Sequence, residues 1–145
     1  MQRHFIHILI ILGLLIGFSS CSSEKSSGPI ESLTYDTFIE KVWDFKSHPD
    51  EFVRQSKKPC VVVFTSAKSE PCQKLQPIIE ALQDKNKGKI EFYSVDVEAE
   101  QALGNSFKID VVPTVLLLPK EGQPTMIQGL RSQTEYEKIV DQLIS

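Results

Sequence analysis

The feature that most constrains the fold of this chain is an uninterrupted apolar run, Val61–Phe64. β-Branched and aromatic residues without polar alternation suit a strand that is buried on both faces, as in a parallel or mixed sheet covered by helices. A short polar break follows, and apolar residues then recur at offsets of three and four from Leu75 to Leu82. The sequence therefore predicts a buried strand, a tight turn and a helix. Cys72 falls where the helix begins, and there the unpaired N–H groups and the helix dipole favour a thiolate.

Two segments around this turn, Lys58–Phe64 and Pro71–Ile78, carry a resemblance to a known family. Together they resemble the thioredoxins, which have a hydrophobic strand, the sequence Trp-Cys-Gly-Pro-Cys-Lys, and a helix that contains a proline. The resemblance implies that the first cysteine of the motif is an exposed nucleophile. It also implies that the second cysteine is largely buried and resolves the mixed disulfide.

This chain departs from the family within the motif itself. The five positions from the tryptophan to the second cysteine are here Lys68, Ser69, Glu70, Pro71 and Cys72. The proline and the second cysteine are therefore kept, whereas the attacking cysteine is a serine. The family also has a buried acid on the central strand and a lysine on the next strand, which help to deprotonate the buried cysteine. Val63 and Ser94 occupy these two positions, so the resemblance implies that the dithiol chemistry has been lost as a unit.

The rest of the chain reads as further helices and strands. Helices are predicted at 33–45, 51–55, 71–85, 98–107 and 134–144, and further strands at 90–97, 115–118 and 125–128. Thr34 and Ser47 are expected to cap the first two helices, and Pro77 is expected to kink the third. The order βαβ followed by ββα is that of the thioredoxin fold, an α/β fold with a central mixed sheet flanked by helices. The resemblance extends from Leu33 to the end of the chain.

A second motif, Val112-Pro113-Thr114, matches the family in its spacing from the first motif. The resemblance implies that Pro113 is cis and packs beside the redox pair. It also implies that the backbone before this proline pairs with extended substrate chains. The predicted substrate groove consists of Lys68, Glu70, Pro71, Val112 and Pro113. The alternative is a proline that only starts a strand.

The amino-terminal residues, 1–20, are interpreted as a bacterial lipoprotein signal. The apolar run Ile8–Phe18 is shorter than the roughly 20 residues that cross a bilayer. Small residues precede Cys21, which resembles the lipidated first residue of a mature lipoprotein. A polar tether, residues 21–32, would then join the lipid to a thioredoxin-like domain at 33–145. The protein is expected in the cell envelope, anchored to a bacterial membrane, with its domain in the periplasm or at the surface. The alternative is an ordinary or uncleaved secretory signal.

Cys72 and Ser69 are the candidate catalytic residues, and the sequence restricts what they can do. The carboxylate of Glu70 opposes thiolate formation at Cys72. Ser69 has a structural role available, because its side chain can accept a hydrogen bond from the N–H of Cys72. Cys60 begins the strand at its far end, roughly 15 Å away at about 3.3 Å per residue, and a disulfide needs Cα atoms within about 7 Å. Cys72 is therefore either a buried structural thiol or a usable monothiol.

Composition argues against several other classes of protein. The formal net charge is −3 and no dense basic patch is visible along the sequence, which argues against a nucleic-acid partner. His48 is the only histidine after the signal segment, and it lies in a predicted turn away from the motif. A Ser-His hydrolase and a zinc site are therefore not expected. No metal and no other cofactor is expected.

Two functional classes remain. The first is a membrane-tethered binding module that holds extracytoplasmic proteins, through an extended segment or a cysteine, without dithiol turnover. The second is a monothiol oxidoreductase in which Cys72 forms mixed disulfides that an external thiol resolves. A third reading is residual thioredoxin-type disulfide reductase activity. However, the two-step thiol–disulfide exchange cannot be completed within one molecule unless the motif contains both an attacking and a resolving thiol. The sequence favours the binding module.

Overall fold

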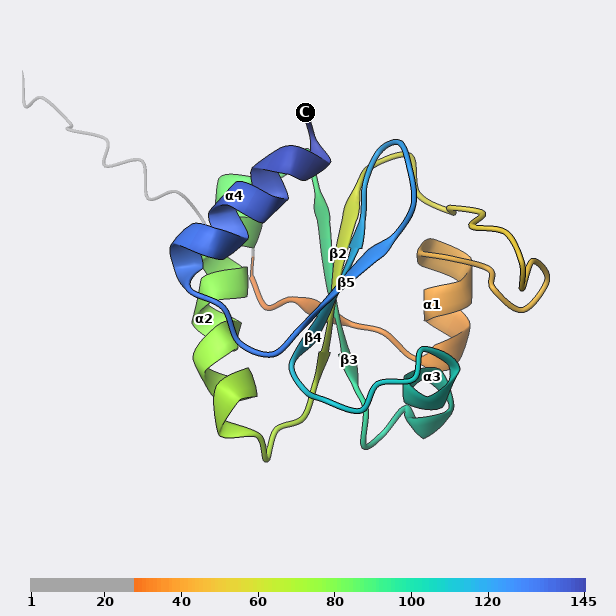
Figure 1. Cartoon of the computed structure of the whole chain (residues 1–145), viewed down its shortest axis with the longest axis horizontal. Coiled ribbons are helices and arrows are strands. Elements are labelled where there is room, and N and C mark those ends of the chain that lie inside the picture. Colours follow the sequence, from red (N-terminus) through yellow and green to blue (C-terminus); the bar gives the residue numbers. More distant parts are fainter. Residues whose placement is uncertain (1–27) are drawn as a thin grey trace, which may run out of the picture.

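A five-stranded mixed sheet forms the centre of the computed structural model, which describes residues 28–145 (Figure 1). The predicted signal segment and Cys21 lie outside these residues. The strands are β1 (Glu31–Ser32), β2 (Cys60–Thr65), β3 (Glu91–Asp96), β4 (Thr114–Leu118) and β5 (Thr125–Gln128). Their order across the sheet is β1-β3-β2-β4-β5. β3 pairs in parallel with β1 and β2, whereas β4 is antiparallel to β2 and β5.

The apolar run found in the sequence lies in β2, the central strand. Five of its six residues are buried, and only Thr65 is partly exposed. Val61 and Val63 belong to one hydrophobic core, and Val62 and Phe64 belong to the core on the opposite face. This alternation follows from the twofold repeat of a strand. The predicted burial on both faces is confirmed.

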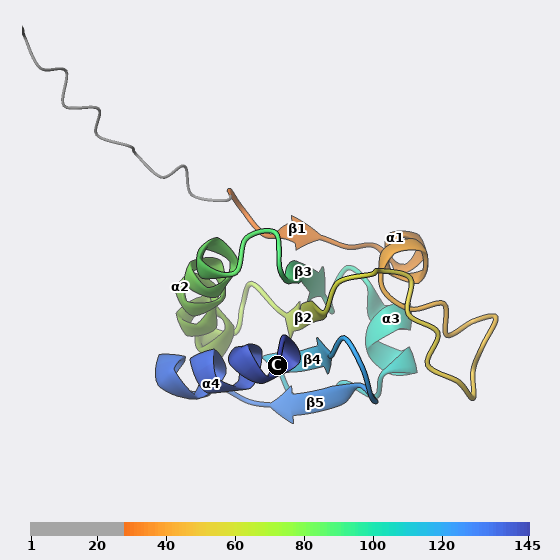
Figure 2. The same ribbon diagram turned by 90° about the horizontal axis from the view of Figure 1, so that it is seen from above.

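Two pairs of helices cover the two faces of the sheet (Figure 2). The helices are α1 (Tyr35–Lys41), α2 (Glu70–Lys85), α3 (Gln101–Ser106) and α4 (Gln133–Leu143). One core lies between the sheet and the pair α2 and α4, and the other lies under α1 and α3. The buried residues of both cores lie between Leu33 and Leu143, so a chain that begins at Ser22 keeps every described element of the fold.

The helix boundaries differ modestly from the predictions. Thr34 caps α1 as expected, with a reciprocal capping box to Thr37, but α1 ends at Lys41 and not at residue 45. α3 begins at Gln101 and not at residue 98, since the N–H of Glu98 is already bonded to the side chain of the last residue of β3. α2 continues through Pro77. The two-residue strand β1 carries no signal that sequence periodicity could detect.

The predicted short helix at 51–55 is wrong. This segment is part of an extended loop that joins α1 to β2 and pairs with itself through a single bridge between Trp43 and Arg54. The Arg54 guanidinium donates to the carbonyl oxygens of Pro119, at 2.6 Å, and Lys120. The Trp43 indole donates to the carbonyl of Glu51 at 3.3 Å and packs edge-on against Phe52. A five-residue helix is unfavourable to nucleate, so these tertiary contacts decide the conformation.

Within residues 28–145, no helix is both long enough and apolar enough to cross a membrane.

Candidate functional site

The turn between β2 and α2 places Ser69 at the N-cap of α2. Its backbone is extended, with φ −88° and ψ 118°, and its Oγ accepts a hydrogen bond from the N–H of Cys72 at 3.4 Å. The N–H of Ser69 donates to the carbonyl of Ser66 at 3.1 Å, which closes the turn. The Gln73 side chain donates to the carbonyl of Ala67 at 2.9 Å. The capping role expected for Ser69 is therefore confirmed, and the hydroxyl is held by the helix.

Cys72 is the third residue of α2, and only 5% of its surface is exposed. Cys60 is fully buried at the first position of β2, in register with Glu91 and Leu118. Both described cysteines are free, as expected from their separation along β2. Burial raises the pKa of the Cys60 thiol to about 12, and the neighbouring Glu91 carboxylate adds to this effect. Cys60 is therefore a neutral core residue, whereas Cys72 is the buried last residue of the motif.

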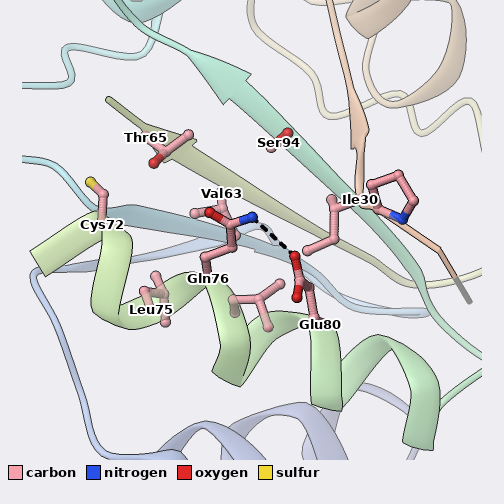
Figure 3. A pocket seen from close by; sticks show the side chains of 10 residues that line it. Ile30, Val63, Thr65, Cys72, Leu75, Gln76, Glu80 and Ser94 are labelled. Carbon is pink, nitrogen blue, oxygen red and sulfur yellow. Dashed lines mark hydrogen bonds between the residues drawn. The ribbon is translucent and has the colours of Figure 1, made fainter. Parts of the chain in front are cut away.

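A cavity of about 180 Å³ lies beside Cys72, between α2 and the sheet (Figure 3). Cys72, Gln76 and Glu80 project from one face of α2 towards β2 and β3. Val63 and Ser94 are directly opposite each other in the parallel register, and both line the cavity. Glu80 accepts a hydrogen bond from Gln76 at 3.0 Å and is the only carboxylate among the lining residues. In the family that the sequence resembles, these two positions carry an acid and a lysine. In this chain they lie side by side near Cys72 and carry small neutral side chains.

Lys68, on the exposed side of the motif, forms an ion pair that the sequence analysis missed. Its Nζ lies 2.6 Å from Glu98, and the Ser66 hydroxyl donates to the other oxygen of the same carboxylate at 2.5 Å. The hydrogen bond from Lys68, and then that from Ser66, hold the pKa of Glu98 below its usual value. The same bond raises the pKa of Lys68. The missed signal is topological: β2 and β3 are parallel neighbours, so residues that follow each strand meet at one edge of the sheet.

The second motif lies beside the first. Thr114 pairs with Phe64 of β2, so Val112 and Pro113 lie next to the residues that follow β2. The peptide bond between Val112 and Pro113 is cis, as the resemblance implied, and Pro113 is buried. Its carbonyl accepts from the N–H of Gly129 at 2.8 Å. Val111 is 45% exposed, and no hydrogen bond joins the backbone of Val112 to any other residue of the described chain.

The predicted groove residues thus come from two segments. Lys68, Glu70 and Pro71 lie on the turn and the first residues of α2, and Glu70 pairs with Lys74 one turn later at 2.7 Å. The other two, at positions 112 and 113, lie on the adjoining loop. Among residues 28–145, no group of histidine, cysteine or acidic side chains is arranged to hold a metal ion. The arrangement presents one buried thiol, a capping hydroxyl and the unpaired backbone of Val112.

Comparison with known proteins gives a consistent result. The thioredoxin family model matches residues 41–142. Thioredoxin from Borreliella burgdorferi is 32% identical over 109 residues, which covers 75% of this chain and 92% of that protein. The chloroplastic thioredoxin Y of Oryza sativa is 32% identical over 75 residues, 52% of this chain and 44% of the rice protein. The crystal structure of chloroplastic thioredoxin z superimposes with a TM-score of 0.64 at 18% identity, over 80% of this chain and 95% of that one, which shows the shared fold.

The family model spans most of the chain, and it includes both the turn that carries Cys72 and the cis-Pro113 loop. The element order, the mixed sheet and the two pairs of helices agree with the similarity to solved thioredoxin structures. This chain belongs to the thioredoxin family.

Proposed function

We propose that this protein is a lipid-anchored thioredoxin-like module of the bacterial cell envelope that binds extended segments of other proteins without dithiol exchange. The observation that carries this proposal is the role of Ser69. It stands where the family's attacking cysteine stands, and its hydroxyl caps α2 in front of a Cys72 that is 5% exposed. A serine hydroxyl needs an adjacent base before it can attack. His48, the only histidine in residues 28–145, lies in the loop before β2.

The groove around Pro113 supports binding. The backbone of Val112 has no partner among the described residues, and Val111 beside it is exposed. An extended chain that pairs with such an edge gains main-chain hydrogen bonds, while the neighbouring side chains provide selectivity. The rim of this groove is polar here, because Lys68 and Glu70 both lie on it and each belongs to an ion pair.

One observation favours a second candidate, the monothiol oxidoreductase. The cavity beside Cys72 leaves space on the inner side of the thiol. In that reaction the Cys72 thiolate attacks a partner disulfide, a mixed disulfide forms, the partner's second sulfur leaves as a thiolate, and an external thiol releases the protein.

The test measures binding of a thiol-free unfolded polypeptide, carboxymethylated α-lactalbumin, to the chain that begins at Ser22. We expect Cys72→Ala to bind as the parent does, with or without reductant. Val111→Asp is expected to weaken binding. Met126→Asp is the matched control, because Met126 is 44% exposed but lies on β5, away from the loop before Pro113. Equal effects of the two aspartates would contradict the groove.

A second measurement separates the two candidates. Alkylation of Cys72 is followed by mass spectrometry in a Cys60→Ser background. Modification only after unfolding supports the binding module. Fast modification of the folded protein at neutral pH, together with reductant-sensitive adducts that Cys72→Ala abolishes, indicates an activated thiolate and favours the monothiol reaction.

The anchor is tested separately in cells. Incorporation of labelled fatty acid is expected in the parent protein and not in Cys21→Ala. Release of the parent protein into the soluble envelope fraction, without label, would contradict lipid anchoring.

A further inference from the structure

One end of the molecule gathers lysines from three separate segments. The end in question is opposite the β2–α2 turn, where β2 begins, β4 ends and the helices α2 and α4 finish (Figure 1). Cys60 pairs with both Glu91 and Leu118, so the residues before β2, before β3 and after β4 meet there. The lysine end, as we call it, carries Lys57, Lys58, Lys85, Lys87, Lys89 and Lys120.

Five of these lysines line two hollows that share Lys58. Lys57, Lys58, Lys89 and Lys120 line one hollow together with Ile144, which is 40% exposed. All six lysine side chains are exposed, and none of them belongs to an ion pair within residues 28–145, where Lys41, Lys68 and Lys74 make the ion pairs. No dense basic patch is visible along the sequence. The basic surface forms only because the fold brings lysines from separate segments together.

Carboxylates at the lysine end are slightly fewer. They are Glu31, Asp84, Glu91, Glu121 and Asp141, and Glu31 pairs with Lys41. Glu91 is only partly exposed, and its carboxylate accepts a hydrogen bond from the Cys60 thiol at 3.6 Å. The motif end has the opposite balance, because its carboxylates outnumber its lysines. The carboxylates are Glu70, Asp96, Glu98, Glu100 and Asp110, and the lysines are Lys68, Lys74 and Lys108. A chain of net charge −3 is therefore polarised along its strands, with its cations concentrated away from the motif.

The described chain also enters the domain beside the lysine end. Pro29 and Glu31 line a second hollow with Lys58 and Lys87, and Pro29 also lines the near side of the cavity beside Cys72. Residues 22–29 separate Cys21 from this point, and eight residues span at most about 28 Å when fully extended. If the motif end faced the anchor, the tether would also have to run along the length of the strands. That length is about 20 Å for a strand of six residues.

We propose that the lysine end docks on anionic phospholipid headgroups and holds the Cys72–Pro113 groove away from the bilayer. This inference rests on the proposed lipid anchor for its biological setting, because one acyl anchor and one basic surface together give the two signals that stable membrane association needs. Lysines near an anionic surface each raise the partition by about fivefold. The attraction acts over about a Debye length, about 8 Å at physiological salt, so only the facing end contributes. The acidic motif end is repelled, which fixes the orientation.

The test uses the chain that begins at Ser22, which carries no lipid. Its partition onto vesicles that contain phosphatidylglycerol is compared with that onto pure phosphatidylcholine vesicles, at low and at physiological salt. We expect salt-sensitive binding to the anionic vesicles only. The quadruple variant K57Q/K58Q/K89Q/K120Q is expected to lose at least about 25-fold in partition, which corresponds to two lysines in contact.

The control variant removes four cations elsewhere: K46Q/K108Q/R131Q/K138Q. It has the same net charge as the lysine-end variant and should retain binding within about threefold, because salt screens charges on distant faces. Equal losses in the two variants would show that net charge alone acts, and would overturn the docking surface. Absence of binding to anionic vesicles at low salt would overturn it as well. Equally tight binding to soluble polyglutamate would identify an acidic protein partner in place of the membrane.

Lysine acetylation footprinting of the parent protein provides an independent readout. Anionic vesicles should slow the acetylation of Lys57, Lys89 and Lys120 and leave Lys46 and Lys108 unchanged. Uniform protection would overturn the orientation. None of these results depends on whether Cys21 is lipidated or on whether the groove binds peptides, so a failure here is distinct from a failure of the proposed function.

Discussion

Replacement of Ser69 by alanine tests whether this residue is a structural cap and not a reacting group. N-cap removal destabilises helices by about 1 kcal/mol, within a range of about 0.5–2. The bond from the Cys72 N–H is 3.4 Å long, which is longer than the usual value of about 2.9–3.0 Å for such bonds. We therefore expect Ser69→Ala to lower the free energy of unfolding by about 0.5–1 kcal/mol.

The structure also sets the size of the thermal shift. The described domain has 118 residues, 28 to 145. With an unfolding entropy of about 2.1 cal/mol/K per residue, the total is about 0.25 kcal/mol/K, so Tm should fall by about 2–4 °C. The assay is urea and thermal unfolding followed by the fluorescence of Trp43, the single tryptophan.

Two variants serve as controls for this experiment. Ser69→Asp retains an acceptor at the N-cap and should stay within a few tenths of a kcal/mol of the parent. Ser132→Ala removes the cap and the reciprocal capping box of α4, which is not part of the motif, and should destabilise by at least as much. Binding of the unfolded polypeptide should be unchanged in Ser69→Ala. Loss of binding or of thiol reactivity without loss of stability would refute the capping argument and give Ser69 a direct part in function.

Three further predictions follow from the same contacts. The pKa of Cys60 is raised from an ordinary 9.0 to about 12, so above pH 9 the unfolded chain loses the thiol proton while the folded chain keeps it. The contribution of the protonated thiol to the free energy of unfolding is therefore fully present below pH 9 and is lost as the pH rises towards 12. At pH 10.5 the parent should therefore lose about 2 kcal/mol more than Cys60→Val, relative to pH 7, in urea unfolding, and parallel pH profiles would contradict this. Lys68→Gln should raise the pKa of Glu98 towards its usual value in a carboxyl NMR titration, and no movement would show that Ser66 alone sets it. Val63→Ala should enlarge the cavity beside Cys72, lower the free energy of unfolding by about 2 kcal/mol and speed the alkylation of Cys72, and a stability change below about 0.5 kcal/mol would show that the cavity collapses.

Local signals predicted much of the fold and part of the site. The apolar run of β2, the N-caps Thr34 and Ser69, and the helix α2 were all readable, because each depends on residues within a few positions of one another. The cis bond before Pro113 was implied by the resemblance, and the structure contains it.

The predicted helix at 51–55 failed for the opposite reason. Its start signal was local, but the contacts that decide the segment are not: Arg54 reaches the carbonyl of Pro119, 65 residues away in the chain. A five-residue helix contributes too few hydrogen bonds to resist such contacts.

The sequence by itself determined that this chain has a buried central strand, a capped helix behind it and a single thiol at the start of that helix. These features depend on side-chain period and on capping, which act within one or two turns of the chain. Only the tertiary structure decided that Glu98 meets Lys68, that Val63 and Ser94 leave a cavity beside Cys72, and that lysines from separate segments form one surface. The physical reason is the parallel and antiparallel register of β2 with its neighbours, which brings residues 30 to 60 positions apart into contact through backbone hydrogen bonds that carry no sequence signature of their own.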